Sequence, residues 1–329
     1  MPLIAVTDLR VQLNTPRGPA DAVRGVSFAL ERGETLGLVG ESGCGKSITA
    51  LALLGLVPER AVVTGSIRFD GEELVGSSDG DLCKLRGNRI GIVFQEPMTA
   101  LNPLHTIGRQ VAEPLRLHQG LSAAAARKEA IALLGRVGLP DAARRVDAYA
   151  HQLSGGQRQR VTIAMALACG PDLLIADEPT TALDVTIQGQ ILDLIADLVA
   201  ERGMALLLIS HDLGVIAENV ARMLVMYGGT VVESGPTAEV FARMAHPYTQ
   251  GLFAARPKLG AAPGTRLATI AGSVPELADL PPGCPFAGRC RIAVDACRDI
   301  VPRPVAIGAG HEARCLRIEA ALGAPLERG

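Results

Sequence analysis

The sequence predicts an α/β fold whose core is a parallel β-sheet, with an antiparallel β region near its start and a small cysteine-containing region at its end. Two short apolar runs, at 173–176 and 205–210, are bounded by turns and separated by a helical pattern, which is typical of parallel strands buried on both faces. A third apolar run, at 35–39, leads directly into a glycine-rich loop. Helical periodicity beginning near residue 97 predicts a helical subdomain at about 97–160.

The first elements along the chain are expected to be short strands. Residues 4–9 and 22–30 alternate between apolar and polar side chains, and the polar stretch at 14–21 between them is expected to be a turn. The remaining elements are expected, in chain order, as a helix at 47–56, a hairpin strand at 64–69 with a turn at Asp70-Gly71, and helices at 123–137 and 158–168.

Length and composition limit the class of protein. The 329 residues suffice for one large domain with a small appendage, and 48% of them are hydrophobic, so a sizeable core can be buried. A formal net charge of −2 gives no electrostatic reason to expect nucleic acid as the main ligand. No apolar run reaches the ~18–20 residues that span a bilayer, and the N-terminus lacks the pattern of a signal peptide. We therefore expect a cytosolic protein whose membrane role would come through partners, and whose seven cysteines do not form disulfides.

The glycine-rich loop is the first candidate site. It fits the pattern G-x-x-x-x-G-K-[ST] and stands between a strand and a helix, as a phosphate-binding loop requires. Glycines let successive backbone N–H groups turn toward an anion, and the following helix adds its positive end. The lysine can reach the β- and γ-phosphates of a nucleotide, and the serine hydroxyl can ligate Mg²⁺. The residues expected to contact the nucleotide are Gly40, Ser42, Gly43, Cys44, Gly45, Lys46 and Ser47.

A pair of carboxylates is the second candidate site. Asp177 and Glu178 follow the apolar run at 173–176, so they are expected at the carboxyl end of a buried strand. There Asp177 can hold Mg²⁺ through water, and Glu178 is the candidate general base for a water that attacks the γ-phosphorus. The two motifs together predict a P-loop NTPase.

The subclass follows from the sequence LSGGQ at 153–157. A serine and two glycines at the start of a helix form a second anion site, which we expect to comprise Ser154, Gly155, Gly156 and Gln157. With this motif the chain resembles the ATP-binding cassette (ABC) family, and the resemblance covers residues 1–250 with every main motif in order. It implies an ABC cassette with a RecA-like parallel core, an antiparallel β subdomain and a helical subdomain.

The resemblance also implies further site residues. Gln95 matches the family's Q-loop, Asp184 ends its D-loop, and His211 matches the switch histidine that steadies the γ-phosphate. The expected catalytic residues are therefore Glu178, His211 and Gln95, with Asp184 contacting the nucleotide. The expected cofactors are ATP and Mg²⁺, the metal being held by Ser47, Gln95 and Asp177.

Two features of the nucleotide site depart from or qualify this pattern. The family's usual adenine-stacking aromatic is absent, because no Phe, Tyr or Trp precedes Phe28, and Leu13 stands at roughly that position. An aliphatic contact predicts a weak preference for ATP over GTP. Cys44 lies inside the loop, and we expect it to be a small filler more than a reactive thiol.

The family's architecture implies a dimer, because ATP is closed between the P-loop of one subunit and LSGGQ of another. Two local patterns, at 94–115 and 246–255, resemble the oligopeptide/dipeptide importer group. That resemblance implies a second, paralogous ATPase subunit, two membrane permeases and, indirectly, an extracytoplasmic solute-binding protein, at the cytoplasmic face of the cell's inner membrane. The alternative, a soluble ABC ATPase that acts on nucleic acid or ribosomes, predicts tandem cassettes, a long coiled coil or basic surfaces, which the sequence lacks.

Four cysteines near the C-terminus require a separate explanation. Cys284, Cys290, Cys297 and Cys315 are thiols that suit either Zn²⁺ or an iron–sulfur cluster. Paired C-x₂-C knuckles, which zinc ribbons favour, are absent, and some members of the resembled family carry a [4Fe–4S] cluster here. We therefore expect a cluster, with zinc or free thiols as alternatives. The expected organisation is a nucleotide-binding domain at 1–255, a Pro/Gly-rich linker at 256–283 and a cysteine-containing extension at 284–329.

Overall fold

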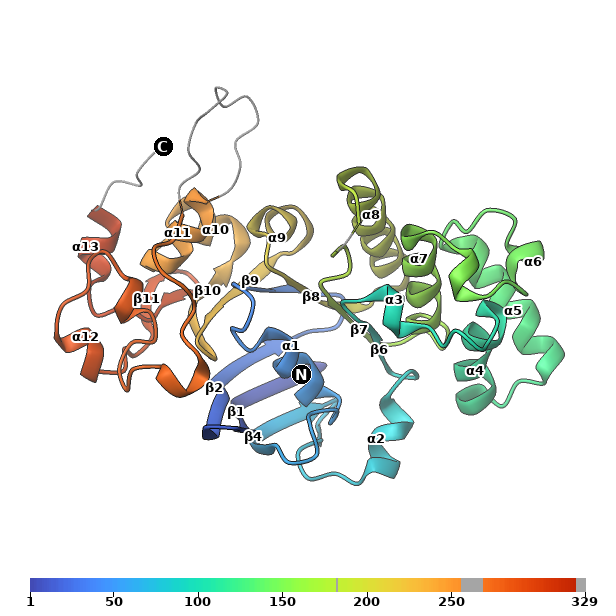
Figure 1. The fold of residues 1–329 in the computed structure, drawn as a ribbon, viewed down its shortest axis with the longest axis horizontal. Helices are drawn as coiled ribbons and strands as arrows, with labels where there is room; N and C mark the ends of the chain where they lie inside the picture. The colour runs from blue at the N-terminus through green and yellow to red at the C-terminus, as the bar shows by residue number, and fades with distance from the viewer. Residues whose placement is uncertain (182, 256–268, 324–329) are drawn as a thin grey trace. The chain divides into compact units, whose positions relative to one another are not determined.

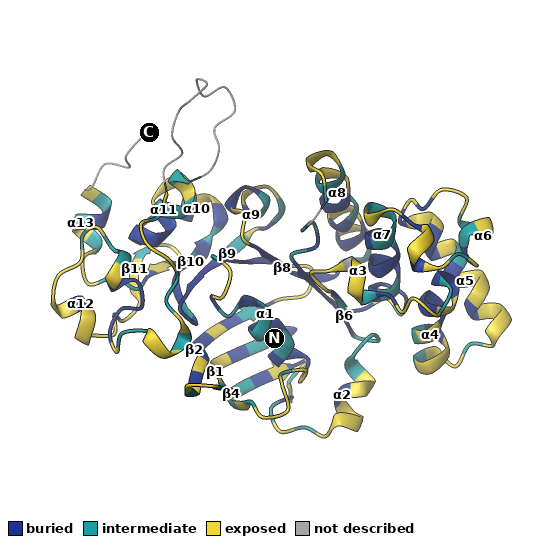
Figure 2. Ribbon diagram, in the orientation of Figure 1, coloured by how far each residue is buried: buried dark blue, intermediate teal, exposed yellow. Residues whose placement is uncertain are grey.

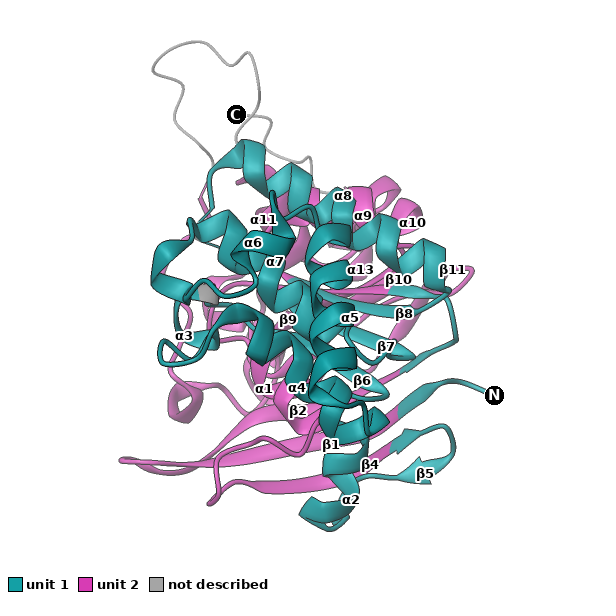
Figure 3. Ribbon diagram, turned by 90° about the vertical axis from the view of Figure 1, so that its right-hand side faces the viewer, with its two compact units in different colours: residues 1–5, 29–35, 68–209 teal, residues 6–28, 36–67, 210–329 magenta. Residues whose placement is uncertain are grey.

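The computed structural model describes residues 1–181, 183–255 and 269–323, which fall into two compact units (Figures 1 and 3). Unit 1 contains residues 1–5, 29–35 and 68–209, and unit 2 contains residues 6–28, 36–67 and 210–329. The first part of the expected linker, residues 256–268, lies outside the described residues, as do Ala182 of the D-loop and the chain end at 324–329.

The N-terminal strands are longer than expected. Strands β1 (Ile4–Thr15) and β2 (Gly18–Leu30) join β4 (Val62–Phe69) and β5 (Glu72–Glu73) in a four-stranded sheet with the order β2-β1-β4-β5. The turn is shorter than the one expected at 14–21, because only Pro16 and Arg17 separate β1 from β2. Thr15 Oγ1 donates to the Gly18 carbonyl over 2.7 Å and closes this tight turn. The hairpin at Asp70-Gly71 is confirmed, with Phe69 opposite Glu72.

Unit 2 has its own sheet strands, in the order β11-β12-β10-β9-β3. Strand β3 (Thr35–Val39) is parallel to β9 (Arg222–Tyr227), and β9 continues by a two-residue turn into the antiparallel β10 (Thr230–Pro236). The C-terminal strands β12 (His311–Ala313) and β11 (Val305–Gly308) extend this sheet, with Glu233 of β10 opposite Ala313. The cysteine-containing region is therefore hydrogen-bonded to the sheet that carries β3.

Unit 1 contains the predicted buried parallel strands. β6 (Ile90–Val93), β7 (Leu173–Asp177) and β8 (Ala205–Ser210) pair in parallel, with Asp177 opposite Ile209. Every residue of β7 and β8 is buried, which Figure 2 shows as continuous dark blue. The prediction of parallel strands covered on both faces is confirmed.

Helices complete each unit. In unit 1, α7 begins three residues earlier than predicted, because Ser154 caps it. The helices of unit 1 are α2 (Asp79–Leu85), α3 (Pro97–Ala100), α4 (Ile107–Gln119), α5 (Ala123–Arg136), α6 (Ala142–Arg145), η1 (Ala150–Gln152), α7 (Gly155–Ala166) and α8 (Val185–Arg202). Those of unit 2 are α1 (Lys46–Leu53), α9 (Leu213–Asn219), α10 (Thr237–Ala242), α11 (Pro247–Ala254), η2 (Leu277–Asp279), η3 (Ala287–Arg289), α12 (Ala296–Asp299) and α13 (Ile318–Gly323). Among the described residues, none of these helices has the length and apolar character to cross a bilayer.

Candidate functional site

The glycine-rich loop of unit 2 connects β3 to α1 through glycines that a larger residue could not replace. A Cβ atom on Gly40 would lie 2.3 Å from the Met226 carbonyl oxygen. Gly45 has φ +94, and a Cβ there would lie 2.4 Å from the Ala22 carbonyl oxygen. Gly45 is also the N-cap of α1, and no side chain of the described residues caps this helix. The start of a helix directs backbone N–H groups outward along its axis, so the beginning of α1 suits an anion.

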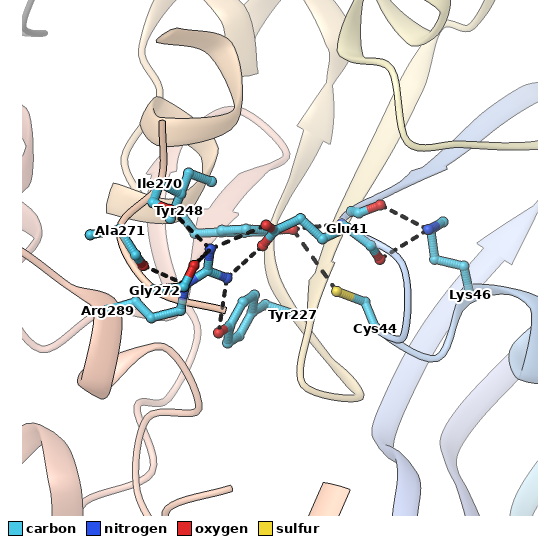
Figure 4. Close-up of polar contacts among 10 residues, drawn as sticks. Glu41, Cys44, Lys46, Tyr227, Tyr248, Ile270, Ala271, Gly272 and Arg289 are labelled. Atoms are coloured by element: carbon cyan, nitrogen blue, oxygen red, sulfur yellow. Dashed lines mark hydrogen bonds and ion pairs between the residues drawn. The ribbon is translucent and has the colours of Figure 1, made fainter. Parts of the chain in front are cut away.

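Lys46 is nearly buried beneath this loop. Lys46 is only 4% exposed. Its Nζ donates to the carbonyl oxygens of Gly40 and Glu41 over 2.8 and 3.1 Å (Figure 4). The ammonium group is therefore held across the loop by backbone oxygens. Cys44 is completely buried, and burial raises the pKa of its thiol, although Lys46 opposes that shift. A neutral, enclosed thiol agrees with the expected role of a small filler.

Two side chains from later in unit 2, those of Tyr248 and Arg289, contact the first part of the loop, and the sequence did not predict them. Tyr248 Oη accepts a hydrogen bond from the Glu41 N–H over 2.7 Å. Arg289 forms an ion pair with the Glu41 carboxylate at 2.7 and 3.2 Å, and it also donates to Tyr227 Oη (Figure 4). Tyr248 belongs to the pattern at 246–255, which in the sequence indicates only the family group.

A cavity of about 600 Å³ lies beside the loop, within unit 2. Its walls are the turn residues Thr15–Arg17, the loop residues Ser42 and Gly43, and the segment 274–278. Arg17 pairs with Glu276 at 3.0 Å and with Asp279 at 2.6 Å, which ties the turn to that segment. The volume is that of a small-molecule pocket, and no aromatic side chain is among its described lining residues.

In unit 1 the carboxylate pair lies at the end of β7, as predicted. Asp177 is 6% exposed. Glu178 has φ +47, and its N–H donates to the Ile209 carbonyl over 2.9 Å, so the chain turns sharply where β7 ends. Glu178 Oε2 accepts hydrogen bonds from Gln95 Nε2 at 3.1 Å and from Thr181 Oγ1 at 3.0 Å. The structure thus brings the expected base and the Q-loop glutamine into direct contact.

The LSGGQ segment forms the start of α7 in unit 1. Ser154 Oγ accepts from the Gln157 N–H, while Gln157 Oε1 accepts from the Ser154 N–H, which is a reciprocal capping box. A Cβ on Gly156 would lie 2.9 Å from Ile187 Cγ2 of α8, which explains the glycine. Asp184 is likewise an N-cap, because its carboxylate accepts from the Ile187 N–H over 3.0 Å.

The expected site residues are divided between the two units. The P-loop residues Gly40–Ser47 and the exposed His211, which directly follows β8, belong to unit 2. The unit 1 residues are Gln95, Asp177, Glu178, Ser154, Gly155, Gly156, Gln157 and Asp184.

The four C-terminal cysteines line a single cavity of about 10 Å³ in unit 2. Cys284, Cys290, Cys297 and Cys315 are free thiols, and burial raises the pKa of Cys284 to about 11, with the other three thiols adding to the shift. Their gathering around one cavity was expected. Nevertheless, in residues 1–181, 183–255 and 269–323 no three His, Cys, Asp or Glu side chains are placed so that they could hold a metal ion.

Comparisons with known proteins assign the family. The profile described as "ABC transporter" matches residues 23–181, and the profile described as "Oligopeptide/dipeptide transporter, C-terminal region" matches residues 232–297. The chain is 50% identical over 323 residues to the oligopeptide transport ATP-binding protein OppD of Mycobacterium tuberculosis, covering 98% of this chain but only 53% of that relative's length. It is also 50% identical over 328 residues to a Brucella melitensis protein that bears the name of a peptide import ATP-binding protein, covering 96% of this chain and 97% of that protein.

A solved structure agrees with these relatives. The ATP-binding cassette MJ0796, in a dimeric post-hydrolysis state bound to ADP and Pi, is 29% identical, with a TM-score of 0.64 over 71% of this chain and 98% of that chain. The predicted cassette fold is therefore confirmed. The chain belongs to the ABC transporter family of ATP-binding proteins, within the group that carries the oligopeptide/dipeptide transporter C-terminal region.

Proposed function

We propose that the protein hydrolyses ATP, with Glu178 as the general base. The observation that carries this proposal is the hydrogen-bonded set at the end of β7, where Gln95 and Thr181 both donate to one oxygen of Glu178. These two donors fix the direction of the carboxylate, as a general base that must face its water requires.

The P-loop residues are proposed to bind the phosphates. The backbone N–H groups at the start of α1 and the Lys46 ammonium supply positive charge to the β- and γ-phosphates. Ser47, Gln95 and Asp177 are proposed to hold Mg²⁺, which neutralises charge on the phosphate oxygens when bound. His211 is proposed to contact the γ-phosphate, and Ser154–Gln157 of a second subunit to close the site from the opposite side.

The test is Glu178→Gln, which keeps the size of the side chain and removes its basicity. We expect MgATP to bind with unchanged affinity, turnover to fall by roughly 10²–10⁴-fold, and a dimer to accumulate with ATP on a gel-filtration column. Lys46→Ala is the matched control, because it removes a phosphate contact and should weaken binding itself. Normal turnover by Glu178→Gln would refute the assignment of the base.

We further propose that ATP hydrolysis drives import of peptides or related small solutes through a membrane complex. The names of the curated relatives support this, as do three large apolar side chains that follow the β6 strand in sequence. Phe94, Met98 and Leu104 are 41%, 62% and 81% exposed, which is typical of a surface that a partner covers. The proposed partners are a paralogous ATPase subunit and two permeases, reached by an extracytoplasmic solute-binding protein, with this chain peripheral on the cytoplasmic face. Co-purification from detergent-solubilised membranes, with the Phe94→Ser/Met98→Ser variant as control, tests the permease contact.

The four cysteines are proposed to hold a [4Fe–4S] cluster within an extension at 284–329, which follows a nucleotide-binding domain at 1–255. Four soft thiols around one cavity form a suitable donor set. Among the described residues no three such side chains are placed to hold a metal ion, so zinc and a cluster would both require these thiols to rearrange. The cavity of about 10 Å³ has room for about one water, so the thiols must move apart to accept a cluster.

An anaerobic preparation of the full chain tests the metal. About four iron and four sulfide per chain are expected for a [4Fe–4S] cluster, and both should be lost in the Cys297→Ser variant. Both should be retained in Cys169→Ser, because this free cysteine belongs to unit 1 and not to the group of four. One zinc per chain without sulfide would favour the alternative site. A sample with neither metal would leave the four cysteines as packing residues.

A further inference from the structure

We propose that Arg289 is a positioning residue for the phosphate-binding loop, which it serves by neutralising Glu41 and drawing that carboxylate away from bound phosphate. The C-terminal region would then be a functional part of the nucleotide site. The inference rests on the proposed ATP-binding function, which it deepens by assigning a role to a residue 248 positions away from the loop residue it contacts.

The contact between the two side chains is buried on the Arg289 side and partly exposed on the Glu41 side. The Arg289 side chain is 6% exposed and that of Glu41 is 28% exposed, and the guanidinium nitrogens lie 2.7 and 3.2 Å from the carboxylate oxygens. Arg289 donates further hydrogen bonds to the Ala271 carbonyl at 2.8 Å and to Tyr227 Oη at 3.3 Å. Paired charges with these additional partners are held in one geometry.

The position of Glu41 explains why it needs a partner. It follows Gly40 directly, and its carbonyl oxygen accepts from the Lys46 ammonium at 3.1 Å, so its backbone is part of the phosphate loop. Figure 4 shows the Glu41 side chain extending toward Arg289 and away from Lys46. A carboxylate without this cation would repel a polyphosphate, and unit charges several ångströms apart at a partly buried site correspond to roughly a tenfold loss of affinity.

A second contact fixes the backbone of the same residue. Tyr248 Oη accepts from the Glu41 N–H at 2.7 Å, and its ring packs edge-on against Tyr227 with centroids 4.7 Å apart. The ring of Phe286, three residues before Arg289, has its centroid 5.1 Å from that of Tyr227 and 5.3 Å from that of Tyr248. Arg289 is therefore supported by a packed aromatic cluster, and it approaches Glu41 from a defined direction.

The experiment is a charge-rescue cycle on the full chain with Arg289→Gln, Glu41→Gln and the double variant. Dissociation constants for MgATP and for inorganic tripolyphosphate are measured by calorimetry. We expect Arg289→Gln to weaken both ligands by about tenfold, and Glu41→Gln in that background to restore affinity to within about twofold of the wild type. If Arg289 only stabilised the fold, the additional Glu41→Gln substitution would not restore the affinity that Arg289→Gln had lost.

The controls separate charge from stability and from the proposed function. Arg289→Lys keeps the charge and should stay within about threefold of the wild type, while thermal unfolding reports whether each variant is folded. If Arg289→Gln binds both ligands normally, or if the double variant binds as weakly as Arg289→Gln, the positioning role is refuted. If the wild type itself binds no MgATP, it is the proposed ATPase function that fails.

Discussion

Gln95 Nε2 donates a hydrogen bond to Glu178 Oε2 over 3.1 Å, so a residue that follows β6 is joined to a residue that follows β7. Because these strands are parallel neighbours, their carboxyl ends lie at one edge of the sheet, and short side chains can meet there. The contact couples the candidate base to a loop whose neighbouring side chains, Phe94 and Met98, are exposed. A protein that binds this loop and moves it would also move Gln95, which donates the hydrogen bond to Glu178.

Gln95→Ala is expected to slow hydrolysis more than it weakens binding. Loss of the Gln95 donor lets the Glu178 carboxylate turn away from the attacking water, and we expect turnover to fall by roughly 10–100-fold. Gln95 is also a proposed Mg²⁺ ligand, but MgATP affinity should fall less than turnover, because the P-loop still holds the phosphates and Ser47 and Asp177 still hold the metal. Thr181→Val removes the other donor and serves as the matched variant, and steady-state phosphate release measures both. Unchanged turnover in Gln95→Ala would show that the hydrogen bond does not orient the base.

Ser154→Ala is expected to affect both stability and dimer formation. Ser154 caps α7 through the Gln157 N–H, so its loss should cost about 1 kcal/mol of unfolding free energy. It also removes a hydroxyl that is proposed to face the nucleotide of a second subunit. Asp184→Ala removes the cap of α8 at a similar cost, whereas Asp184→Asn keeps it.

Denaturant unfolding and ATP-dependent gel filtration on a Glu178→Gln background measure the two effects. A Ser154→Ala protein that is destabilised but dimerises as readily as its parent would restrict the serine to a capping role.

Local sequence patterns predicted the buried strands well, but they did not predict the side chains that contact the P-loop from distant parts of the chain. β3 and β8 were located to the residue, because each is an apolar run bounded by turns. The polar residues at 14–21 concealed the ends of β1 and β2, since an exposed alternating strand tip has the composition of a turn. The contact between Glu41 and Arg289 left no local signal, because two charged residues so far apart in sequence read as ordinary surface positions until the chain is folded.

The cavity beside Ser42 and Gly43 predicts how selective the protein is for its nucleotide base. Its described lining residues include no aromatic ring, so a base placed there would meet aliphatic and polar groups of these residues. We expect the affinities for MgATP and MgGTP to differ by less than about tenfold. Ala278→Trp would fill the cavity and should weaken both nucleotides while leaving inorganic tripolyphosphate unaffected. Competition titrations measure all three, and a variant that binds ATP normally would place the base elsewhere.

The docking of the C-terminal strands predicts that His311 stabilises the whole of unit 2. The side chain of Glu233 in β10 is completely buried. Its carboxyl group accepts hydrogen bonds from the Ala245 and His246 N–H groups at 2.6 and 3.0 Å. His311 Nε2 lies 2.8 Å from the same carboxyl group, at the start of β12. His311→Ala would leave a buried oxygen with one partner fewer and create a cavity, so we expect a loss of about 2–3 kcal/mol in the free energy of unfolding. His311→Gln retains a donor and should recover part of that loss. If His311→Ala instead unfolded with the wild-type midpoint, β11 and β12 would contribute nothing to the stability of the sheet that carries the phosphate-binding loop.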